Sequence, residues 1–457
     1  MPPPQRGGKD PSGPRARRGG PSVRVAPAGV PRWSEAQAER HLRSLELFGM
    51  RFGLEKMRRM MTVLGSPERR FGSIHIVGTN GKTSTARLTA AILQRHGLRT
   101  GTYTSPHLAS YRERVQVGER EVSGEEFAAA IARAAWASER VNRTLQGDDH
   151  VTQFELLTAA AFFQMARREV QVGVIEAGLG GRYDATSVVP SRVTVLTNVA
   201  LEHTRWLGPT LTDIAEEKLA VLGDGATLVL GADLAPEAQR VAARAAGERG
   251  ASVLQSDPAR LELPPLRAAG DFQRQNLALA RLAAQVYLEG EGIEPRARAV
   301  AEAAAATLVP GRLQVVGDDP LTVLDGAHNP HAVRALVRSL PAVLGARPLG
   351  LVMGVLEDKD AASMLEVLLG VCERAWFTAP PSARALSPAA LQSRARQLDF
   401  ADTSCEADPL RALEQAQRWA RARGGAVLAT GSVYLVGDLL QRLELDEKAG
   451  VARERTR

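Results

Sequence analysis

Cysteine, aromatic residues and long apolar runs are all scarce in this chain of 457 residues. The two cysteines, Cys372 and Cys405, are too few for a disulfide framework and lack metal-site spacing, so we expect a reducing, cytoplasmic setting. No uncharged apolar stretch reaches the roughly 20 residues of a membrane span. Residues 1–32 contain no apolar core of a secretory signal peptide. The sequence therefore predicts neither a membrane protein nor a disulfide-stapled one.

What is present is typical of a soluble chain with more than one domain. Hydrophobic residues make up 44% and charged residues 24% of the sequence. Part of the net charge of +7 lies in residues 1–32, which are rich in Pro, Gly and Arg and have almost no apolar periodicity. We expect this segment to be a disordered basic arm. A basic arm could contact nucleic acid, but a solvated tail is the simpler interpretation, and we expect no nucleic-acid partner.

From about residue 33 onward, short apolar strands alternate with Ala-rich helices, which indicates a mostly parallel sheet with crossover helices. After "LVPGRLQVV" the pattern restarts with "LTVLDGAHNPHAVRALVRSL". We therefore predict an α/β fold with a P-loop sheet domain over residues 33–311 and a smaller Rossmann-like domain over 312–445. The boundary is placed near Gly311, inside a Pro-Gly break, and residues 446–457 form a charged tail.

The stretch "IHIVGTNGKTSTARLTAAIL", residues 74–93, reads as strand, glycine turn and helix. Gly78 and Gly81 allow a tight turn whose N–H groups face phosphate oxygens, Lys82 can reach the outer phosphates, and the Thr83 hydroxyl can ligate Mg²⁺. The loop is two residues shorter than G-x-x-x-x-G-K-[ST]. A structural turn is the alternative. A switch GTPase would need N-K-x-D, which is absent, and a small kinase would be a compact single domain. The predicted nucleotide contacts are Gly78, Thr79, Asn80, Gly81, Lys82, Thr83 and Ser84.

Three further residues carry weaker local signals. Glu176 ends the apolar strand "VQVGVIE", and a carboxylate there favours a Mg²⁺ ligand over a structural salt bridge. His203 in "LEHT" lies at a strand end, where spacing alone indicates an ordinary polar residue. Lys218 follows two acidic residues in "DIAEEKLAVL", a pattern typical of a solvated helix face.

Eight blocks occur in order: "HIVGTNGKTS", "YTSPHLASYRERV", "TQFELLTAAAF", "EAGLGGRYDATS", "TNVALEHTRWLGPTLTDIAEEK", "PGRLQVV", "LDGAHNPHAV" and "ATGSVYLVGDLL". This set resembles the folylpolyglutamate synthase/dihydrofolate synthase family of the Mur ligase superfamily, over roughly residues 34–443. The chain departs from the family pattern in three places. Thr83 stands where the family commonly has Gly, "EKLAV" replaces "EKAGI", and "LEH" replaces "LDH".

The resemblance implies an ATP-dependent ligase. ATP would phosphorylate a substrate carboxylate, and the amine of L-glutamate would attack the acyl phosphate. The implied partners are small molecules, namely folate or dihydropteroate, L-glutamate and ATP. The implied ions are two Mg²⁺, with K⁺ as a further candidate. We expect the protein to be a monomer. The alternatives are a Mur-type ligase acting on a different carboxylate and a non-catalytic nucleotide-binding relative.

Roles also carry over by resemblance. Lys82, Lys218 and His328 would be catalytic. The amine of Lys218 would be carbamylated by CO₂, which requires a lowered pKa. The implied metal ligands are Thr83, Ser105, Glu176, His203 and the carbamylated Lys218. Asn276 would contact adenine, and His328 would contact the incoming glutamate. Arg312 and Asp325 would contact the nucleotide. The implied substrate residues are Thr152, Phe154, Asp184 and Ala185 on the pterin side, for which core packing is the alternative at Phe154, and Ser432 in the glutamate pocket.

Overall fold

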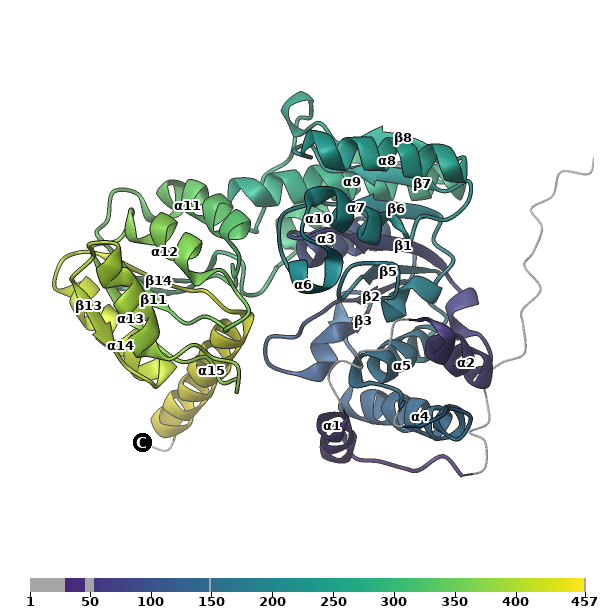
Figure 1. Cartoon of the computed structure of the whole chain (residues 1–457), viewed down its shortest axis with the longest axis horizontal. Helices are drawn as coiled ribbons and strands as arrows, with labels where there is room; N and C mark the ends of the chain where they lie inside the picture. Colours follow the sequence, from purple (N-terminus) through teal and green to yellow (C-terminus); the bar gives the residue numbers. More distant parts are fainter. Residues whose placement is uncertain (1–28, 46–52, 148, 456–457) are drawn as a thin grey trace, which may run out of the picture.

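The computed structural model describes residues 29–45, 53–147 and 149–455, with side chains described up to residue 445 (Figure 1). The predicted basic arm lies, up to residue 28, outside the described residues. The predicted charged tail continues the last helix, α15 (Val433–Arg455). Within the described part of the chain, no helix is both long and apolar enough to cross a bilayer.

The first sheet has eight strands in the order β4-β3-β2-β5-β1-β6-β7-β8. Strands β2, β5, β1, β6, β7 and β8 run parallel, and β3 and β4 are antiparallel at one edge. The bounds are β1 (Gly72–Val77), β2 (Thr100–Tyr103), β3 (Val115–Val117), β4 (Arg120–Glu121), β5 (Val172–Glu176), β6 (Val193–Leu196), β7 (Thr227–Leu230) and β8 (Ser252–Gln255).

Helices cover both faces of this sheet, and the alternation of strand side chains divides the core accordingly. Ile74 and Ile76 of β1 pack toward the helices α3, α9 and α10, whereas Val77 packs toward α7 and α8. A third cluster joins α1, α2, α4 and α5 to Tyr103 and Ile175. Burial on both faces explains why these strands read as unbroken apolar runs. The helices are α1 (Glu35–Ser44), α2 (Glu55–Leu64), α3 (Lys82–Arg95), α4 (Gly124–Asn142), α5 (Gln153–Arg167), α6 (Thr204–Leu207), α7 (Leu211–Leu219), α8 (Pro236–Arg249), α9 (Asp271–Gly290) and α10 (Ala297–Ala306).

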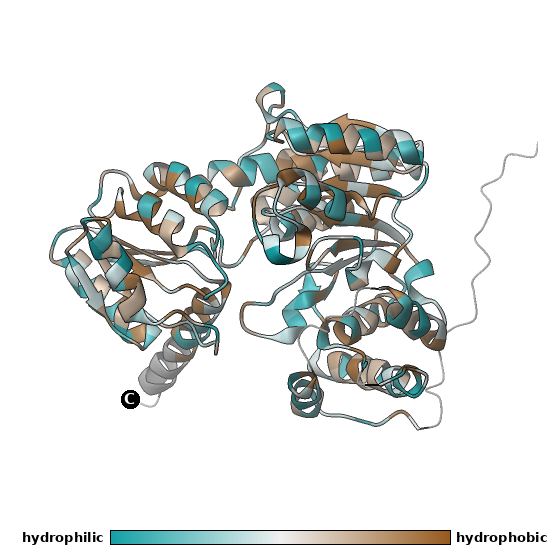
Figure 2. Ribbon diagram, in the orientation of Figure 1, coloured by the Kyte–Doolittle hydropathy of each residue, from teal (hydrophilic) through white to brown (hydrophobic). Residues whose placement is uncertain are grey.

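The second sheet has the order β13-β12-β11-β14-β10-β9, with only β9 antiparallel. Figure 2 shows its apolar strands enclosed by helices whose outward turns are hydrophilic. One face packs against α11, α12 and α13, and the other against α14 and α15. The bounds are β9 (Gln314–Asp318), β10 (Leu321–Leu324), α11 (Pro330–Leu344), β11 (Leu349–Met353), α12 (Ala361–Leu369), β12 (Arg374–Phe377), α13 (Pro388–Gln397), β13 (Thr403–Cys405), α14 (Pro409–Arg421) and β14 (Ala426–Thr430).

The predicted α/β class with two sheets is confirmed. Ser34 caps α1 in a capping box with Gln37, as the sequence indicated. Gly97, in a left-handed conformation with φ 89°, follows the end of α3 as expected. Gly311 lies in the linker between α10 and β9, and we keep it as our proposed domain boundary.

The two domains also touch away from the strand ends, where α15 meets a loop of the first domain. A Cβ added at Gly437 would lie 2.0 Å from the carbonyl oxygen of Leu108. The Gln441 side chain donates a hydrogen bond of 2.8 Å to the carbonyl of Ala109. Glycine at position 437 therefore allows the helix to approach the loop backbone closely.

We predict that Gly437→Ala lowers the free energy of unfolding by about 1–3 kcal/mol, because the new methyl group cannot fit without backbone movement. Gly247→Ala is a matched control. That glycine also lies in a helix, but its Cβ would meet no atom within 4 Å, so alanine should stabilise by about 0.5–1 kcal/mol. Urea unfolding of both variants measures the difference. Equal changes in the free energy of unfolding, with the same sign, would contradict the close approach of α15 to the Leu108 backbone.

Candidate functional site

The phosphate-loop candidate joins β1 to α3 and is fastened to the end of β6. Gly78 has φ 146°, and a Cβ there would lie 1.8 Å from the Thr197 hydroxyl oxygen. Gly81 has φ 81°, and its Cβ would lie 2.5 Å from Oδ1 of Asn276. The Thr197 hydroxyl donates to the carbonyl of Asn80 at 2.7 Å. Neither glycine can be replaced without strain, and the loop presents the N-terminus of α3 to the cavity.

A cavity between the two domains gathers the predicted nucleotide and metal residues. Residues from the ends of β1, β5, β6 and β10 line it, because the carboxyl ends of parallel strands in an open α/β sheet share one edge. The predicted residues in its lining are Gly78, Thr79, Asn80, Gly81, Lys82, Thr83, Ser84, Ser105, Glu176, His203, Lys218, Asn276, Arg312, Asp325 and His328.

Glu176 is held beside the loop by parallel pairing of β5 with β1, in which it lies opposite Ile76. Its carboxylate is 2% exposed. The Thr83 hydroxyl donates to its two oxygens at 3.0 and 2.9 Å, and the Ser105 N–H donates at 3.2 Å. Burial raises the pKa of Glu176, and the nearby Lys82 ammonium opposes that rise. The Thr83 hydroxyl and the Glu176 carboxylate thus form one cluster of hard oxygen atoms, and the Ser105 backbone borders it.

His203 lines the same cavity. It is the N-cap of α6 in a left-handed conformation, φ 53°, and burial lowers its pKa to about 4, so the imidazole is neutral. Within the described residues, no group of three or more His, Cys, Asp or Glu side chains is arranged to hold a metal.

Lys218 contradicts the solvated-face interpretation of its helix. Its side chain is 4% exposed, and Nζ donates a hydrogen bond of 2.9 Å to the carbonyl of Gly78. The Lys82 ammonium donates to the same carbonyl at 3.1 Å. Burial, together with repulsion from Lys82, lowers the pKa of Lys218 to about 7. Helix α7 folds against the loop, so the pattern "EEK" presents its lysine inward.

From the second domain, Asp325 and His328 reach the cavity on the loop after β10. Asp325 is buried and accepts hydrogen bonds from the Leu313 N–H at 2.8 Å and the Ala327 N–H at 2.7 Å. Burial raises the pKa of Asp325, and the Arg312 guanidinium opposes this. The carboxylate therefore holds the linker in place and keeps Arg312 at the cavity wall.

Unlike His328, the other predicted substrate residues, on the pterin side and at Ser432, lie outside the described lining of the cavity. Thr152 and Asp184 cap helical turns, Phe154 packs against Tyr103 with ring centroids 6.3 Å apart, and Ala185 is buried. A Cβ at Gly178, which does line the cavity, would lie 2.5 Å from Phe154 and 3.1 Å from Asp184. These side chains therefore stand directly behind the wall. Ser432 is buried and accepts a hydrogen bond from the Tyr434 N–H.

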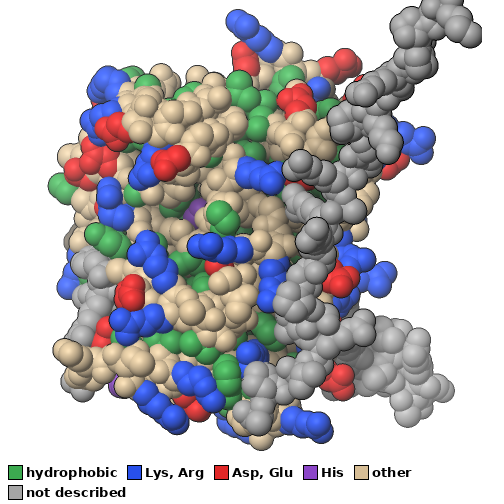
Figure 3. All heavy atoms as spheres, turned by 90° about the vertical axis from the view of Figure 1, so that its right-hand side faces the viewer, with side chains coloured by type: hydrophobic (Ala, Val, Ile, Leu, Met, Phe, Trp, Pro, Cys, Tyr) green, Lys and Arg blue, Asp and Glu red, His purple; other side chains and the backbone are tan. Residues whose placement is uncertain are grey.

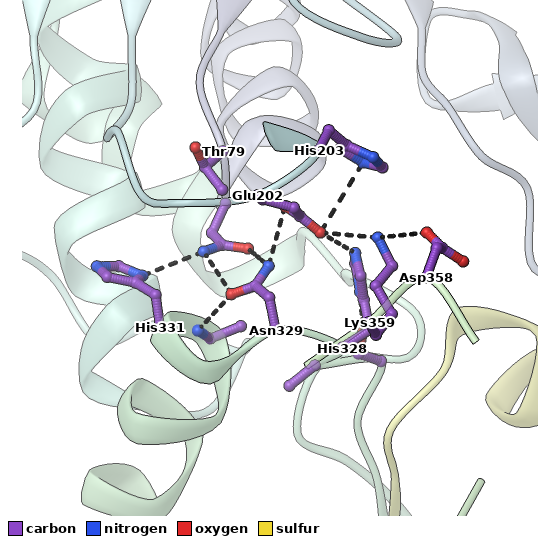
Figure 4. A network of polar contacts seen from close by, with 12 residues as sticks. Thr79, Glu202, His203, His328, Asn329, His331, Asp358 and Lys359 are labelled. Atoms are coloured by element: carbon purple, nitrogen blue, oxygen red, sulfur yellow. Dashed lines mark hydrogen bonds and ion pairs between the residues drawn. The ribbon is translucent and has the colours of Figure 1, made fainter. Parts of the chain in front are cut away.

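Sequence reasoning missed a polar network that spans the two domains (Figure 4). Glu202 of the first domain accepts contacts from His328, Asn329 and Lys359 of the second. Although burial alone would raise it, the pKa of Glu202 lies well below its ordinary value, because the contacts with His328 and Lys359 favour the carboxylate. All four residues follow the carboxyl ends of strands β6, β10 and β11. Polar residues at such strand ends commonly contribute to a site, and this position is the local signal by which the sequence could have indicated them.

Two family models match the chain. The Mur ligase middle domain matches residues 76–255, and the Mur ligase glutamate ligase domain matches residues 311–433. The folylpolyglutamate synthase of Lacticaseibacillus casei is 33% identical over 365 residues, which is 74% of this chain and 84% of that protein.

Solved structures agree over nearly the whole chain. A Mycobacterium tuberculosis folylpolyglutamate synthase complexed with ADP has a TM-score of 0.83 and 29% identity, covering 90% of this chain and 98% of that one. A bifunctional folylpolyglutamate synthase/dihydrofolate synthase with Mn, AMPPNP and L-glutamate bound has a TM-score of 0.76 and 30% identity, covering 91% and 100%. Both resemble this protein in the two-sheet architecture.

Because Lys218 is buried, we predict that the free energy of unfolding depends on pH. Between the ordinary lysine pKa of 10.5 and the lowered value of about 7, the unfolded chain binds a proton that the folded protein does not. Wild-type stability should therefore rise with pH across this window, and Lys218→Met should stabilise the protein most near pH 7 and least near pH 10.5. Urea unfolding in CO₂-free buffer measures this. An equal gain at both pH values would show that the amine is not neutralised on folding.

Proposed function

The chain belongs to the folylpolyglutamate synthase/dihydrofolate synthase family of Mur ligases, and we propose that it couples L-glutamate to a pteroate or folate carboxylate at the expense of ATP. The observation that carries this proposal is the meeting of a phosphate loop with Glu176 and Lys218 in one domain and with Asp325 and His328 in the other, around a single cavity. The relatives' names and ligands support the same reaction.

The phosphate loop and α3 would bind the triphosphate. Backbone N–H groups at the N-terminus of α3 and the Lys82 ammonium would bind its oxygens. The ammonium, which here donates to the carbonyls of Gly78 and Thr79, would turn to the phosphates. Asn276 lies against Gly81 and is proposed to meet adenine. Arg312 would approach the phosphates from the second domain. When the domains meet, its guanidinium would add a positive charge next to the phosphoryl group that is transferred.

The residues present fit a divalent cation. A buried carboxylate with two hydroxyl-bearing neighbours offers hard oxygen ligands, and burial raises its pKa, so a nearby cation would favour the ionised form. We propose that Thr83, Ser105 and Glu176 hold one Mg²⁺ and that His203 contributes to a second. When bound, such ions screen the repulsion between substrate carboxylate and phosphates. The Mn complex of a relative supports divalent metal use, and K⁺ remains a further proposal.

Lys218 is proposed to be carbamylated. The ammonium would first lose one proton. The neutral amine would then attack CO₂, forming an N–C bond as one C–O π bond breaks and a second proton leaves, so that a buried cation becomes an anion. Two observations support this: the amine is fully enclosed, and its pKa is lowered to about 7, so a large fraction is neutral near that pH. The carbamate would stand beside Gly78 and Lys82, where the Lys82 ammonium would stabilise the new negative charge.

The acceptor and the amino acid would meet on opposite walls. The pterin would enter near Gly178, with Phe154 and Asp184 supporting that wall and Thr152 and Ala185 behind it. L-glutamate would enter on the side of His328 and Ser432, where its carboxylates need cationic or amide partners. His328, fixed by a 2.8 Å contact between Nδ1 and the carbonyl of Gly326, is proposed to orient the attacking amine.

We further propose a cytoplasmic monomer whose partners are small molecules rather than nucleic acid or membranes. Both cysteines are free, as suits a reducing compartment. On the face seen in Figure 3, Lys and Arg side chains are scattered among Asp and Glu side chains, whereas a nucleic-acid site gathers basic residues into a stripe or patch.

The deciding experiment measures ATP-dependent product formation from dihydropteroate and from tetrahydrofolate, each with L-glutamate. We expect activity with both acceptors and only with L-glutamate among the amino acids. Glu176→Ala and Lys82→Ala should each reduce turnover by about a hundredfold or more while the fold is retained. Activity with neither acceptor, but with a peptidoglycan-type precursor, would favour a Mur-type ligase instead.

For the carbamate, we expect ¹³CO₂ to give a bicarbonate-dependent carbamate resonance that Lys218→Ala abolishes. The same variant should be nearly inactive, and a small carboxylic acid added in solution should restore part of its activity. A fully active wild-type enzyme in CO₂-free buffer would contradict the modification.

A further inference from the structure

The Glu202 carboxylate of the first domain faces three side chains of the second domain (Figure 4). Its Oε1 lies 3.0 Å from Nζ of Lys359 and 3.3 Å from Nε2 of His328, and its Oε2 accepts a hydrogen bond of 3.1 Å from Nδ2 of Asn329. These three side chains come from the loops after β10 and β11, whereas Glu202 comes from the loop after β6. One side chain therefore connects two sheets.

The Glu202–Lys359 pair is enclosed on both sides, with each side chain 9% exposed. A buried pair of this kind is sensitive to the loss of one member, because the remaining charge is left desolvated and unpaired. Lys359 has a second carboxylate partner, Asp358, at 3.4 Å, but Asp358 belongs to the same loop and is 39% exposed. Among the described residues, Glu202 is the carboxylate that ties the lysine to the other domain.

Asn329 extends this contact to the phosphate loop. Asn80 and Asn329 exchange two amide hydrogen bonds, of 3.2 and 2.9 Å, and Asn80 also contacts Nδ1 of His331 at 3.1 Å. The Asn329 Oδ1 in addition caps α11 by accepting from the Ala332 N–H. A continuous chain of contacts thus runs from Glu202 through Asn329 to the loop that would hold the triphosphate.

We propose that Glu202 is a positioning residue that clasps the second domain onto the first, and that through Asn329 and Asn80 the clasp sets the phosphate loop for ATP before any substrate binds. The proposal rests on the proposed function for its effect on ATP, but not for the clasp itself. Glu202 stands in "LEH", and its carboxylate reaches Lys359, His328 and Asn329 at once.

The test compares Glu202→Gln with the matched control Asp358→Asn. Both remove a carboxylate from Lys359, but only the first breaks an interdomain pair. Small-angle scattering of the ligand-free protein should show a larger radius of gyration for Glu202→Gln and an unchanged one for Asp358→Asn.

In the ligase assay, Glu202→Gln should lower kcat/KM for ATP by about tenfold or more through a raised KM. Asp358→Asn should lower kcat/KM by about twofold or less. Glu202→Asp, which keeps the carboxylate, should recover part of the loss.

Lys359→Met breaks the same pair from the other side, remote in sequence from His203, and should reproduce the wider scattering profile. The double variant Glu202→Gln/Lys359→Met should be no wider than either single variant, because one interaction can be lost only once. Unchanged scattering in both single variants, or additive effects in the double variant, would overturn the clasp. Since scattering is measured without ATP or folate, inactivity of the wild type with every folate acceptor would refute the proposed function alone.

Discussion

The parallel pairing of β1 with β5 and β6 is the constraint on which the site depends. It places Glu176 opposite Ile76 and Leu196 opposite Val77, so all three strands end level at one edge. The loop after β1 is then pressed against the end of β6, where the Thr197 side chain leaves no room for a Cβ at Gly78. A one-residue slip of β5 would turn the Glu176 carboxylate to the opposite face of the sheet, away from the phosphate loop.

Buried charge is the second theme, because buried groups of both signs lie beside the loop after β1. Lys82 and Lys218 both donate to the Gly78 carbonyl. Burial and the repulsion between the two ammonium groups lower the pKa of Lys218, which is the more deeply buried of the two. Glu176 is enclosed beside the same loop and gains proton affinity by burial. Such an arrangement stores unfavourable electrostatics that a triphosphate and its metal ions would relieve, which is typical of sites built for charged ligands.

The second domain contributes through contacts that are few but enclosed. Asp325 fastens the linker that carries Arg312, and Glu202 meets Lys359 across the interface. Away from the cavity, α15 approaches the Leu108 carbonyl through Gly437. Apolar side chains of the first domain join these contacts, because Phe272 packs on one core cluster of the second domain and Leu108 on the other. Inter-domain surfaces of this kind allow relative motion.

The sequence by itself determined the local features: the strand–loop–helix of residues 74–93, the Ser34 capping box, the left-handed Gly97 and the restart of the α/β pattern. Each rests on contacts within a few residues, such as Ser34 with Gln37, and so leaves a readable spacing. Only the tertiary structure decided that Lys218 points inward, that Thr152 and Asp184 lie outside the described cavity lining, and that Glu202 pairs with Lys359. Those last two residues are 157 positions apart in the chain, and no local pattern encodes a meeting that depends on how two separate sheets pack.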